Sequence, residues 1–332
     1  MSEDLLHGGA LDHMRARFPD APEPWLDLST GINPWPYPNT DISLAALARL
    51  PTEADYRACR SAMATAIKAP EDTIVLAPGS ELLIRLLPEI IDARRIAILS
   101  PTYGDHYPVW HNIGANILQT RSPLDAVETS EVIIICNPNN PDGHVFPIDI
   151  LNQARERLAA RGGWLIVDEA YGDLYAEQSL AAQGGSDGLL ILRSFGKFFG
   201  LAGLRLGGLI APAGLCDVVK HHLGTWPVSG AALEIGARAY ADAAWQTNTR
   251  KKLADASVRL KTVIETSSLK LIGGTHLFQY VETDCAHALW EHLARHGIYV
   301  RRFDWSDKHL RIGLTANAEE EARLAAALNL LK

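Results

Sequence analysis

Between residues 73 and 211, short apolar runs alternate with segments of helical spacing, and this pattern most constrains how the chain can fold. Short strand-forming runs that alternate with helices indicate a mostly parallel sheet covered by helices on both faces. We therefore expect an α/β protein with strands at 73–77, 96–99, 115–119, 132–136, 164–167, 189–192 and 206–211.

Polar side chains follow the ends of several of these expected strands. In open parallel sheets, ligands bind at the carboxyl ends of the strands. The residues that fall there are Ser80, Tyr103, Asn140, Asp168 and Lys197. The pattern alone therefore predicts that these side chains line one ligand site.

Lys197 lies among glycines and aromatic residues directly after an expected buried strand. Burial disfavours the charged form of lysine and lowers its pKa by up to about 3–5 units, which suits an amine that forms a Schiff base with an aldehyde cofactor. Arg205, eight residues later, carries a planar fork suited to a phosphate. The alternative is an exposed lysine on a flexible glycine loop.

Two further stretches place polar groups directly after expected strands. Gly79, Ser80 and Glu81 form a glycine turn into a helix, with Ser80 as the expected N-cap, and backbone N–H groups at such a helix start can bind a phosphate. An ordinary strand-to-helix turn is the alternative. Asp168 ends a run of Trp-Leu-Ile-Val, so its carboxylate should be paired.

The string Ser194-x-Gly-Lys197, followed by Gly-Leu-x-Gly-x-Arg205-x-Gly, resembles the cofactor-lysine segment of fold-type I pyridoxal phosphate (PLP) enzymes, the aspartate aminotransferase superfamily. The loop Asn-Pro-Asn-Asn140-Pro-Asp-Gly resembles a second motif of that superfamily. The resemblance implies PLP as cofactor, a mostly parallel sheet of the seven-stranded type sandwiched by helices, and a smaller α+β C-terminal domain.

The resemblance also implies roles for the residues that match. Lys197 would hold the cofactor and later move protons, and Asp168 would pair with the pyridine nitrogen. Asn140 and Tyr171 would contact the phenolic oxygen, and Tyr103 would stack on the ring. The phosphate would be held by residues of the glycine turn and of the lysine segment: Gly79, Ser80, Glu81, Ser194 and Arg205.

Substrate anions call for arginines, and the late strands offer three. Arg311, in Leu-Arg-Ile-Gly, matches the family's carboxylate-binding arginine and would form a bidentate clamp. Arg301 matches a second anion-binding arginine of the branches with phosphorylated substrates, although an ordinary surface arginine is the alternative. Arg302 could point inward instead, because strand side chains alternate.

Within the superfamily, the strings His7-Gly8-Gly9, Leu-Asp-Leu-Ser-Thr-Gly-Ile-Asn33-Pro-Trp-Pro and Ser-Pro-Thr-Tyr-Gly-Asp-His resemble the cobalamin-biosynthesis branch, the L-threonine-O-3-phosphate decarboxylases. This implies loss of the α-carboxylate and formation of (R)-1-amino-2-propanol phosphate. His7, Gly8 and Gly9 would close over the substrate phosphate, with Asn33 and Asn140 also near the substrate. A disordered terminal histidine is the alternative reading of His7.

The core motifs indicate the cofactor and not the bond that is broken. A histidinol-phosphate-type aminotransferase therefore stays open as the second hypothesis. That group often carries a Tyr-Pro whose tyrosine reaches the partner subunit's cofactor, whereas this chain has Leu50-Pro51 and a nearby Tyr56. Either Tyr56 substitutes or the contact is missing. The family implies a homodimer.

We expect three parts: an N-terminal arm over 1–40, a large PLP-binding domain over 41–230, and a small domain over 231–332 that starts with a long connecting helix at 231–265. The net charge of −8 argues against nucleic acid as a partner. The absence of a long apolar run and of a signal-peptide core favours a cytoplasmic protein without a membrane partner. The histidines at 287, 292 and 296 lack a zinc pattern, so we expect no metal.

Overall fold

The computed structural model describes residues 7–330, which form two compact units. The larger unit contains residues 36–140 and 144–246. The smaller unit contains the described parts of 1–35 and 247–332, together with 141–143. Within the described residues, no helix combines the length and apolar character needed to span a bilayer.

The larger unit is built on a seven-stranded sheet in the order β2-β8-β7-β6-β5-β3-β4. β8 runs antiparallel to both of its neighbours, and the other pairs are parallel. The strands are β2 (Ile74–Ala77), β3 (Arg95–Leu99), β4 (Asn116–Thr120), β5 (Val132–Cys136), β6 (Trp164–Asp168), β7 (Leu189–Ser194) and β8 (Gly207–Ile210). This confirms the expected α/β class and mostly parallel sheet.

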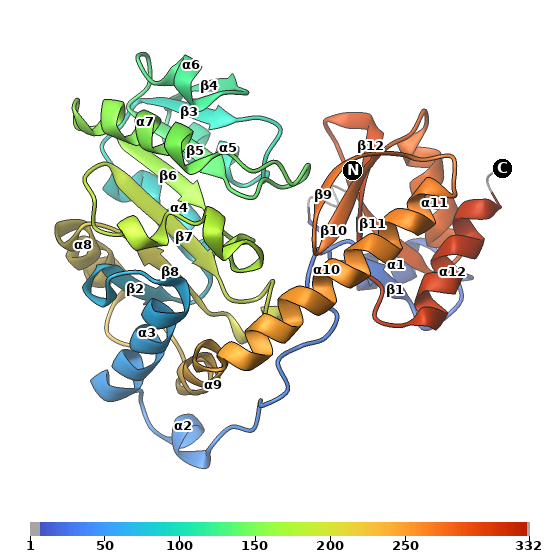
Figure 1. Ribbon diagram of the computed structural model, residues 1–332, viewed down its shortest axis with the longest axis horizontal. Coiled ribbons are helices and arrows are strands. Elements are labelled where there is room, and N and C mark those ends of the chain that lie inside the picture. The colour runs from blue at the N-terminus through green and yellow to red at the C-terminus, as the bar shows by residue number, and fades with distance from the viewer. Residues whose placement is uncertain (1–6, 331–332) are drawn as a thin grey trace. The chain divides into compact units, whose positions relative to one another are not determined.

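Helices cover this sheet, as Figure 1 shows for the larger unit. Its helices are α2 (Leu44–Ala48), α3 (Glu53–Ile67), α4 (Ser80–Ile90), α5 (His106–Asn112), α6 (Pro123–Ala126), α7 (Ile148–Ala159), α8 (Ala213–Leu223), α9 (Gly230–Ala241) and the start of α10 (Ala243–Glu265). α4, α5 and α8 bury apolar side chains against one set of strand residues, including Ile98, Ile134 and Leu192. Every residue of β5 is buried, as expected for a strand covered on both faces.

The smaller unit contains a five-stranded sheet in the order β1-β11-β12-β10-β9. Its strands are β1 (Leu26–Leu28), β9 (Lys270–Thr275), β10 (Phe278–Glu282), β11 (Ile298–Phe303) and β12 (Ser306–Gly313), and its helices include α1 (Leu11–Arg17), α11 (Ala286–Arg295) and α12 (Ala318–Asn329). β1 pairs in parallel with β11, which makes the N-terminal segment part of this unit. The division between the units therefore differs from the expected boundaries at residues 40 and 230.

The long helix expected at 231–265 is interrupted, so that prediction is wrong in detail. α9 ends at Ala241 and α10 begins at Ala243. Asp242, between them, has a backbone ψ of 74°, and its Oδ1 accepts a hydrogen bond from the Trp245 N–H at 2.9 Å. Aspartate competes for backbone N–H groups in this way and ends one helix while it starts the next.

Candidate active site

The carboxyl ends of β5, β6 and β7 lie side by side in the larger unit. Cys136 is in register with Asp168, and Asp168 with Leu192. The loops that follow these strands carry Asn140, Tyr171 and Lys197, so the predicted convergence of polar residues at one sheet edge follows from the parallel pairing.

The lysine loop is anchored by its aromatic neighbours. Phe195 and Phe199 stack with ring centroids 4.3 Å apart, and Phe198 packs edge-on against Phe199 at 5.1 Å. All three phenylalanine side chains are fully buried, whereas Lys197 is half-buried. The backbone N–H of Tyr37 donates to the carbonyl of Phe199 at 2.9 Å. The loop is therefore held on both sides of an accessible lysine, which excludes the flexible-loop alternative.

The start of α4 forms an anion cradle with Arg205. Gly79 has φ +88°, and a Cβ added there would lie 2.9 Å from Nη2 of Arg205. A Cβ on Gly207 would lie 2.7 Å from the backbone N of Ser80, and Gly207 pairs with Ser194 across β7 and β8. The expected phosphate residues therefore meet at a helix N-terminus where backbone N–H groups are available to an anion.

Two details of this cradle differ from expectation. The N-cap residue is Gly79 and no side chain caps the helix, so Ser80 is its first residue rather than its cap. Arg205 adopts a left-handed backbone conformation with φ 54° and ψ 58°. Such strained conformations of residues other than glycine cluster at functional sites. The Glu81 carboxylate pairs with Arg85 at 2.7 Å. Glu81 therefore offers the cradle its backbone rather than its charge.

Asp168 is buried, and both of its carboxylate oxygens accept hydrogen bonds within the larger unit. Nε2 of His106 lies 3.0 Å from Oδ2, and the Ala170 N–H donates to Oδ1 at 3.0 Å. The Cys136 thiol donates to Oδ2 at 3.9 Å. Burial opposes a charge on His106, but the Cys136 sulfur and the Asp168 carboxylate outweigh it and raise the pKa of His106 to about 10. The histidine is thus a cation at neutral pH, placed beside the Asp168 carboxylate.

His106 is a functional residue that the sequence reasoning did not single out. It begins α5, three residues after Tyr103, at the same sheet edge as Asp168. The sequence offers only its place shortly after Tyr103, and nothing in the sequence indicates its contact with Asp168. Metal ions are commonly held by histidine, cysteine and acidic side chains. Among residues 7–330, the one group of three such side chains with ligand atoms within 4.8 Å of one another is His106, Cys136 and Asp168. The hydrogen bond between His106 and Asp168 already occupies two of those ligand atoms.

Tyr103 is fixed by two carboxylates. Its hydroxyl lies 2.9 Å from Oδ2 of Asp105 and 3.2 Å from Oε2 of Glu81, and its ring meets that of His106 edge-on at 5.9 Å. Burial, then Asp105 and Glu81, raise the pKa of Tyr103 well above its ordinary value. The tyrosine therefore stays neutral, and its ring orientation is set from the hydroxyl end.

The loop after β5 is tied to its surroundings next to Asn140. The side chain of Asn139 donates to the carbonyl of Pro101 at 3.0 Å and accepts from Thr102 at 2.7 Å. Tyr171, in the turn after β6, is only 4% exposed. Asn140 and Tyr171, the two residues expected to contact the phenolic oxygen, thus lie on constrained turns that follow β5 and β6.

In the smaller unit, Arg301 of β11 is the direct cross-strand partner of Arg311 of β12. Cross-strand partners project from the same face of a sheet, and like charges placed there destabilise it unless an anion lies between them. Arg302 faces the other way, where it contacts the His287 ring nitrogen at 3.0 Å and lies over the ring of Trp290. The alternation thus separates Arg302 from the arginine pair.

The glycine-rich N-terminal segment lies against the same strands. The Gly9 N–H donates to Oγ of Ser29 at 2.8 Å, and a Cβ on Gly8 would lie 2.6 Å from the Ser29 carbonyl oxygen. That oxygen also accepts from Nη2 of Arg311 at 2.6 Å. Tyr299 donates its hydroxyl proton to the carbonyl of His7 at 3.2 Å. The segment 7–9 is therefore ordered beside Arg311, and the disordered reading of His7 is wrong.

Arg311 is 5% exposed and its guanidinium lies 4.9 Å from the centre of the Phe278 ring. Asn33 is also buried, and its side-chain oxygen accepts from the Trp35 N–H at 2.9 Å. The side-chain oxygen of Asn33 thus holds the local backbone turn toward Trp35, in addition to any contact with a substrate.

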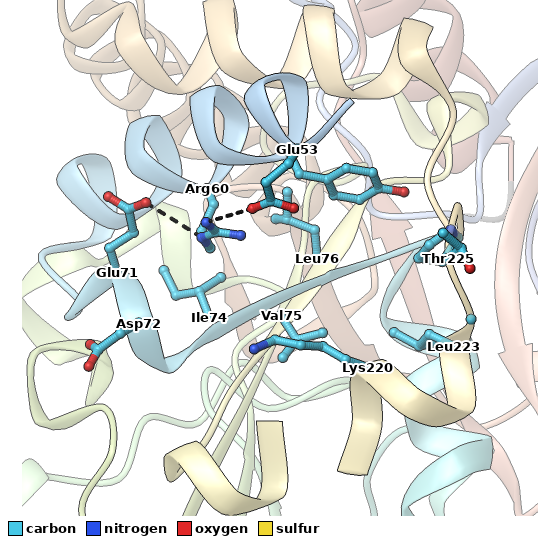
Figure 2. A pocket seen from close by; sticks show the side chains of 13 residues that line it. Glu53, Arg60, Glu71, Asp72, Ile74, Val75, Leu76, Lys220, Leu223 and Thr225 are labelled. Carbon is cyan, nitrogen blue, oxygen red and sulfur yellow. Dashed lines mark hydrogen bonds and ion pairs between the residues drawn. The ribbon is translucent and has the colours of Figure 1, made fainter. Parts of the chain in front are cut away.

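The larger unit also has a separate pocket of about 590 Å³. Of the site candidates expected from the sequence, Tyr56 alone lines it. Figure 2 shows its charged wall, where Arg60 pairs with Glu53 at 3.3 Å and with Glu71 at 3.5 Å. The Tyr56 hydroxyl donates to the Val228 carbonyl and accepts from the Val228 N–H, at 3.2 and 3.0 Å. This tyrosine is therefore engaged within its own chain.

The family model for aminotransferase class I and II matches residues 46–328. The chain belongs to this family. It is 39% identical to the threonine-phosphate decarboxylase of Pseudomonas aeruginosa over 98% of this chain and 97% of the relative, and 38% identical to that of a Sinorhizobium species over 99% and 98%. A histidinol-phosphate aminotransferase of Legionella pneumophila is 31% identical over 63% of this chain and 60% of its own.

Solved structures support the fold. The histidinol-phosphate aminotransferase of Clostridium acetobutylicum superposes with a TM-score of 0.83 at 19% identity, covering 92% of this chain and 98% of that one. The L-threonine-O-3-phosphate decarboxylase of Porphyromonas gingivalis gives 0.79 at 17% identity, covering 92% and 99%. At these identities the likeness shows the fold alone, and it confirms the fold-type I architecture.

The larger unit fits the cofactor of this family. It offers a half-buried lysine on a well-packed loop, a buried aspartate at a strand end, and an anion cradle in which glycine leaves room beside the Ser80 N–H and Arg205. These are the groups that an aldehyde, a pyridine nitrogen and a phosphate require. The chain is a PLP-dependent enzyme.

Proposed function

We propose that this enzyme removes the α-carboxylate of L-threonine O-3-phosphate, giving CO2 and (R)-1-amino-2-propanol O-phosphate for cobalamin biosynthesis. The observation that carries the proposal is the extent of similarity: the two decarboxylases match essentially the whole chain at 38–39% identity, whereas the aminotransferase of Legionella matches 63% of it at 31%. The whole-chain match includes the N-terminal segment and the late strands, where the substrate-binding candidates lie.

Bound PLP supplies an electron sink that accepts the electron pair left at Cα when CO2 departs. The chain's own residues prepare that sink. Asp168, beside the His106 ring, would pair with the pyridine nitrogen, and Asn140 and Tyr171 would bind the phenolic oxygen. Gly79, Ser80, Ser194 and Arg205 hold the phosphate. Lys197 would bind the cofactor at rest, and either Lys197 or a nearby hydroxyl would deliver the proton that Cα gains in place of CO2.

Substrate orientation decides which bond at Cα breaks, and the smaller unit offers the groups that bind two anions. Threonine phosphate carries a carboxylate and a phosphate of about −1.5 to −2 charges. Arg311 and Arg301, side by side on one sheet face, suit such a ligand, with Arg311 on the carboxylate and Arg301 on the phosphate. The amides and backbone of His7, Gly8, Gly9 and Asn33 complete this binding surface.

The enzyme acts as a homodimer in this proposal. Leu44, Leu47 and Leu50 are 79%, 64% and 60% exposed, and Trp226 is 54% exposed. The three leucines lie on the short segment 44–50, and exposed apolar side chains that lie close together favour a covered surface. The segment belongs to the larger unit, where Gly230 packs on Ala46 of α2. The Tyr56 hydroxyl, bound to Val228, supports the view that the tyrosine contact with the partner's cofactor is missing.

The cytoplasm is the proposed compartment. All four cysteines are free thiols, and Cys59, Cys136 and Cys216 are buried. Reduced thiols in this number fit a reducing compartment.

Product analysis separates the proposal from its rival. PLP-loaded protein is incubated with O-phospho-L-threonine and no 2-oxo acid, and the product is identified by mass spectrometry and NMR. We expect 1-amino-2-propanol phosphate. A histidinol-phosphate-type aminotransferase would instead leave the carbon skeleton intact, use histidinol phosphate, and turn over only when a 2-oxo acid is added.

A further inference from the structure

A buried ionic cluster joins the two strand ends that carry the cofactor residues. Arg193 of β7 contacts Glu169 through Nη1 at 2.7 Å and Asp173 through Nη2. Arg193, Glu169 and Asp173 are 2%, 1% and 6% exposed. Glu169 also accepts from the Ser179 hydroxyl at 2.6 Å and from the Leu180 N–H at 2.8 Å. The cluster is thus closed to solvent, and its hydrogen bonds run through both Nη atoms of Arg193, whereas Nε of Arg193 is buried without a hydrogen-bond partner among the described residues.

A gain in stability of the fold does not by itself explain a buried cluster of three charged side chains. The cluster sets one guanidinium against two carboxylates, and burying charges costs free energy that their attraction repays only in favourable geometry. Burial opposes the charge of Arg193, whereas Asp173 and Glu169 raise its pKa. Apolar side chains of similar volume often stabilise a core as well as a buried ion pair does. A role in fixing local geometry is therefore the better explanation.

Each member of the cluster stands beside a cofactor residue in the chain. Glu169 directly follows Asp168, Asp173 comes two residues after Tyr171, and Arg193 directly precedes Ser194. The guanidinium therefore fastens the turn after β6, with Tyr171 in its middle, to the last residues of β7. The chain continues from there to Lys197 within a few residues.

Gly172 makes the close approach of the guanidinium possible. A Cβ at this position would lie 2.5 Å from Nη1 of Arg193 and 2.9 Å from Cβ of Glu169. Any other residue would push the arginine away from the turn. The tightness of this packing indicates that the distance between the turn and β7 is set within narrow limits.

We propose that Arg193, through Glu169 and Asp173, is a positioning residue that sets the place of the Tyr171 hydroxyl relative to the cofactor bound at Lys197. Because the cluster is closed to solvent, it acts on the site through its neighbours in the chain. The inference rests on the PLP site of the proposed function, and it holds whichever bond at Cα is broken.

The test uses Arg193→Lys and Asp173→Asn in the PLP-loaded enzyme. Lysine keeps the charge but replaces the planar fork, whose two Nη atoms reach the two carboxylates, with a single ammonium group, and asparagine keeps the shape of aspartate but loses its charge. The readout is the pH midpoint of the visible absorbance of PLP bound to Lys197, measured well below each variant's Tm. The Tyr171 hydroxyl stabilises the anionic phenolic oxygen of the cofactor, and loosening it favours the protonated form.

We expect both variants to move this midpoint upward by about 1 pH unit, the size of a hydrogen bond to a charged oxygen. We expect kcat to fall by about 10- to 100-fold because small misplacements of reacting groups are costly. KM should change much less. Leu158→Ala is the matched control: Leu158 is fully buried in α7, and its carbonyl accepts from Gly163 at the amino end of β6, opposite the site. It should lower Tm and leave the midpoint unchanged.

A midpoint equal to that of the wild type in Asp173→Asn, or an equal shift in Leu158→Ala, overturns the proposal. Asp173→Asn preserves volume, so it keeps the test decisive if Arg193→Lys does not fold. A shifted midpoint in an enzyme that releases no CO2 would leave this inference intact while the decarboxylase assignment fails.

Discussion

The ion pair between His106 and Asp168 predicts a specific dependence of stability on pH. The pKa of His106 is raised from 6.5 to about 10, a rise of about 3.5 units. At about 1.4 kcal/mol per unit, the protonated histidine contributes at most about 5 kcal/mol. For a pKa raised by folding, this contribution is complete below pH 6.5 and is lost as the pH rises through 10. The pair therefore stabilises the protein most at neutral and mildly acidic pH.

The perturbation is His106→Gln, which keeps a hydrogen-bond donor toward Asp168 but removes the titratable charge. The assay is Tm of the PLP-loaded protein at several pH values from 6 to 10. At about 2 °C per kcal/mol, the wild type should exceed the variant by up to about 10 °C near pH 6. The gap should close as the pH approaches 10.

His221→Gln provides the matched control, because His221 is an exposed histidine of α8 in the same unit. Its Tm should follow that of the wild type at every pH. A gap between wild type and His106→Gln that stays constant from pH 6 to 10 would contradict this prediction, since it would mean that folding does not shift the protonation of His106 across this range.

Three further predictions concern the roles of individual residues. Lys197→Ala should lose the visible absorbance of bound PLP after dialysis and lower kcat by several orders of magnitude; an absorbance that persists would contradict the assignment of the lysine. Gly79→Ala should weaken PLP binding by about tenfold or more, measured by cofactor titration, because its Cβ would lie 2.9 Å from Nη2 of Arg205 and its φ is +88°. Arg301→Met should raise KM for the phosphorylated substrate by about 10- to 100-fold through loss of a charged hydrogen bond, whereas Arg302→Met, on the opposite face of the same strand, should change KM little; equal effects would contradict the side-by-side arginine pair.

The architecture of the larger unit could be predicted because its signals are local. Fully apolar runs such as β5 read as buried strands, and parallel neighbours bring their carboxyl ends to one edge. The positions of Asn140, Asp168 and Lys197 followed from that rule. Their roles came from motif resemblance, and the contacts of Asp168 add His106, whose importance depends on a hydrogen bond across 62 residues of sequence.

Features that depend on long-range pairing could not be predicted. β1 has three residues, and only its pairing with β11 places the N-terminal segment in the smaller unit. The choice between Arg301 and Arg302 needed the register of β11 against β12. The break between α9 and α10 depends on Asp242, whose helical neighbours mask the signal of a single capping side chain.

Release of labelled CO2 from carboxyl-labelled O-phospho-L-threonine would show directly whether this enzyme is a decarboxylase. The PLP-loaded enzyme is assayed without a 2-oxo acid, with Lys197→Ala as the inactive control. We predict repeated turnover, with one CO2 and one 1-amino-2-propanol phosphate formed for each substrate consumed. An enzyme that binds PLP at Lys197 and releases no CO2, but transfers the amino group once a 2-oxo acid is added, would contradict the account and favour the aminotransferase.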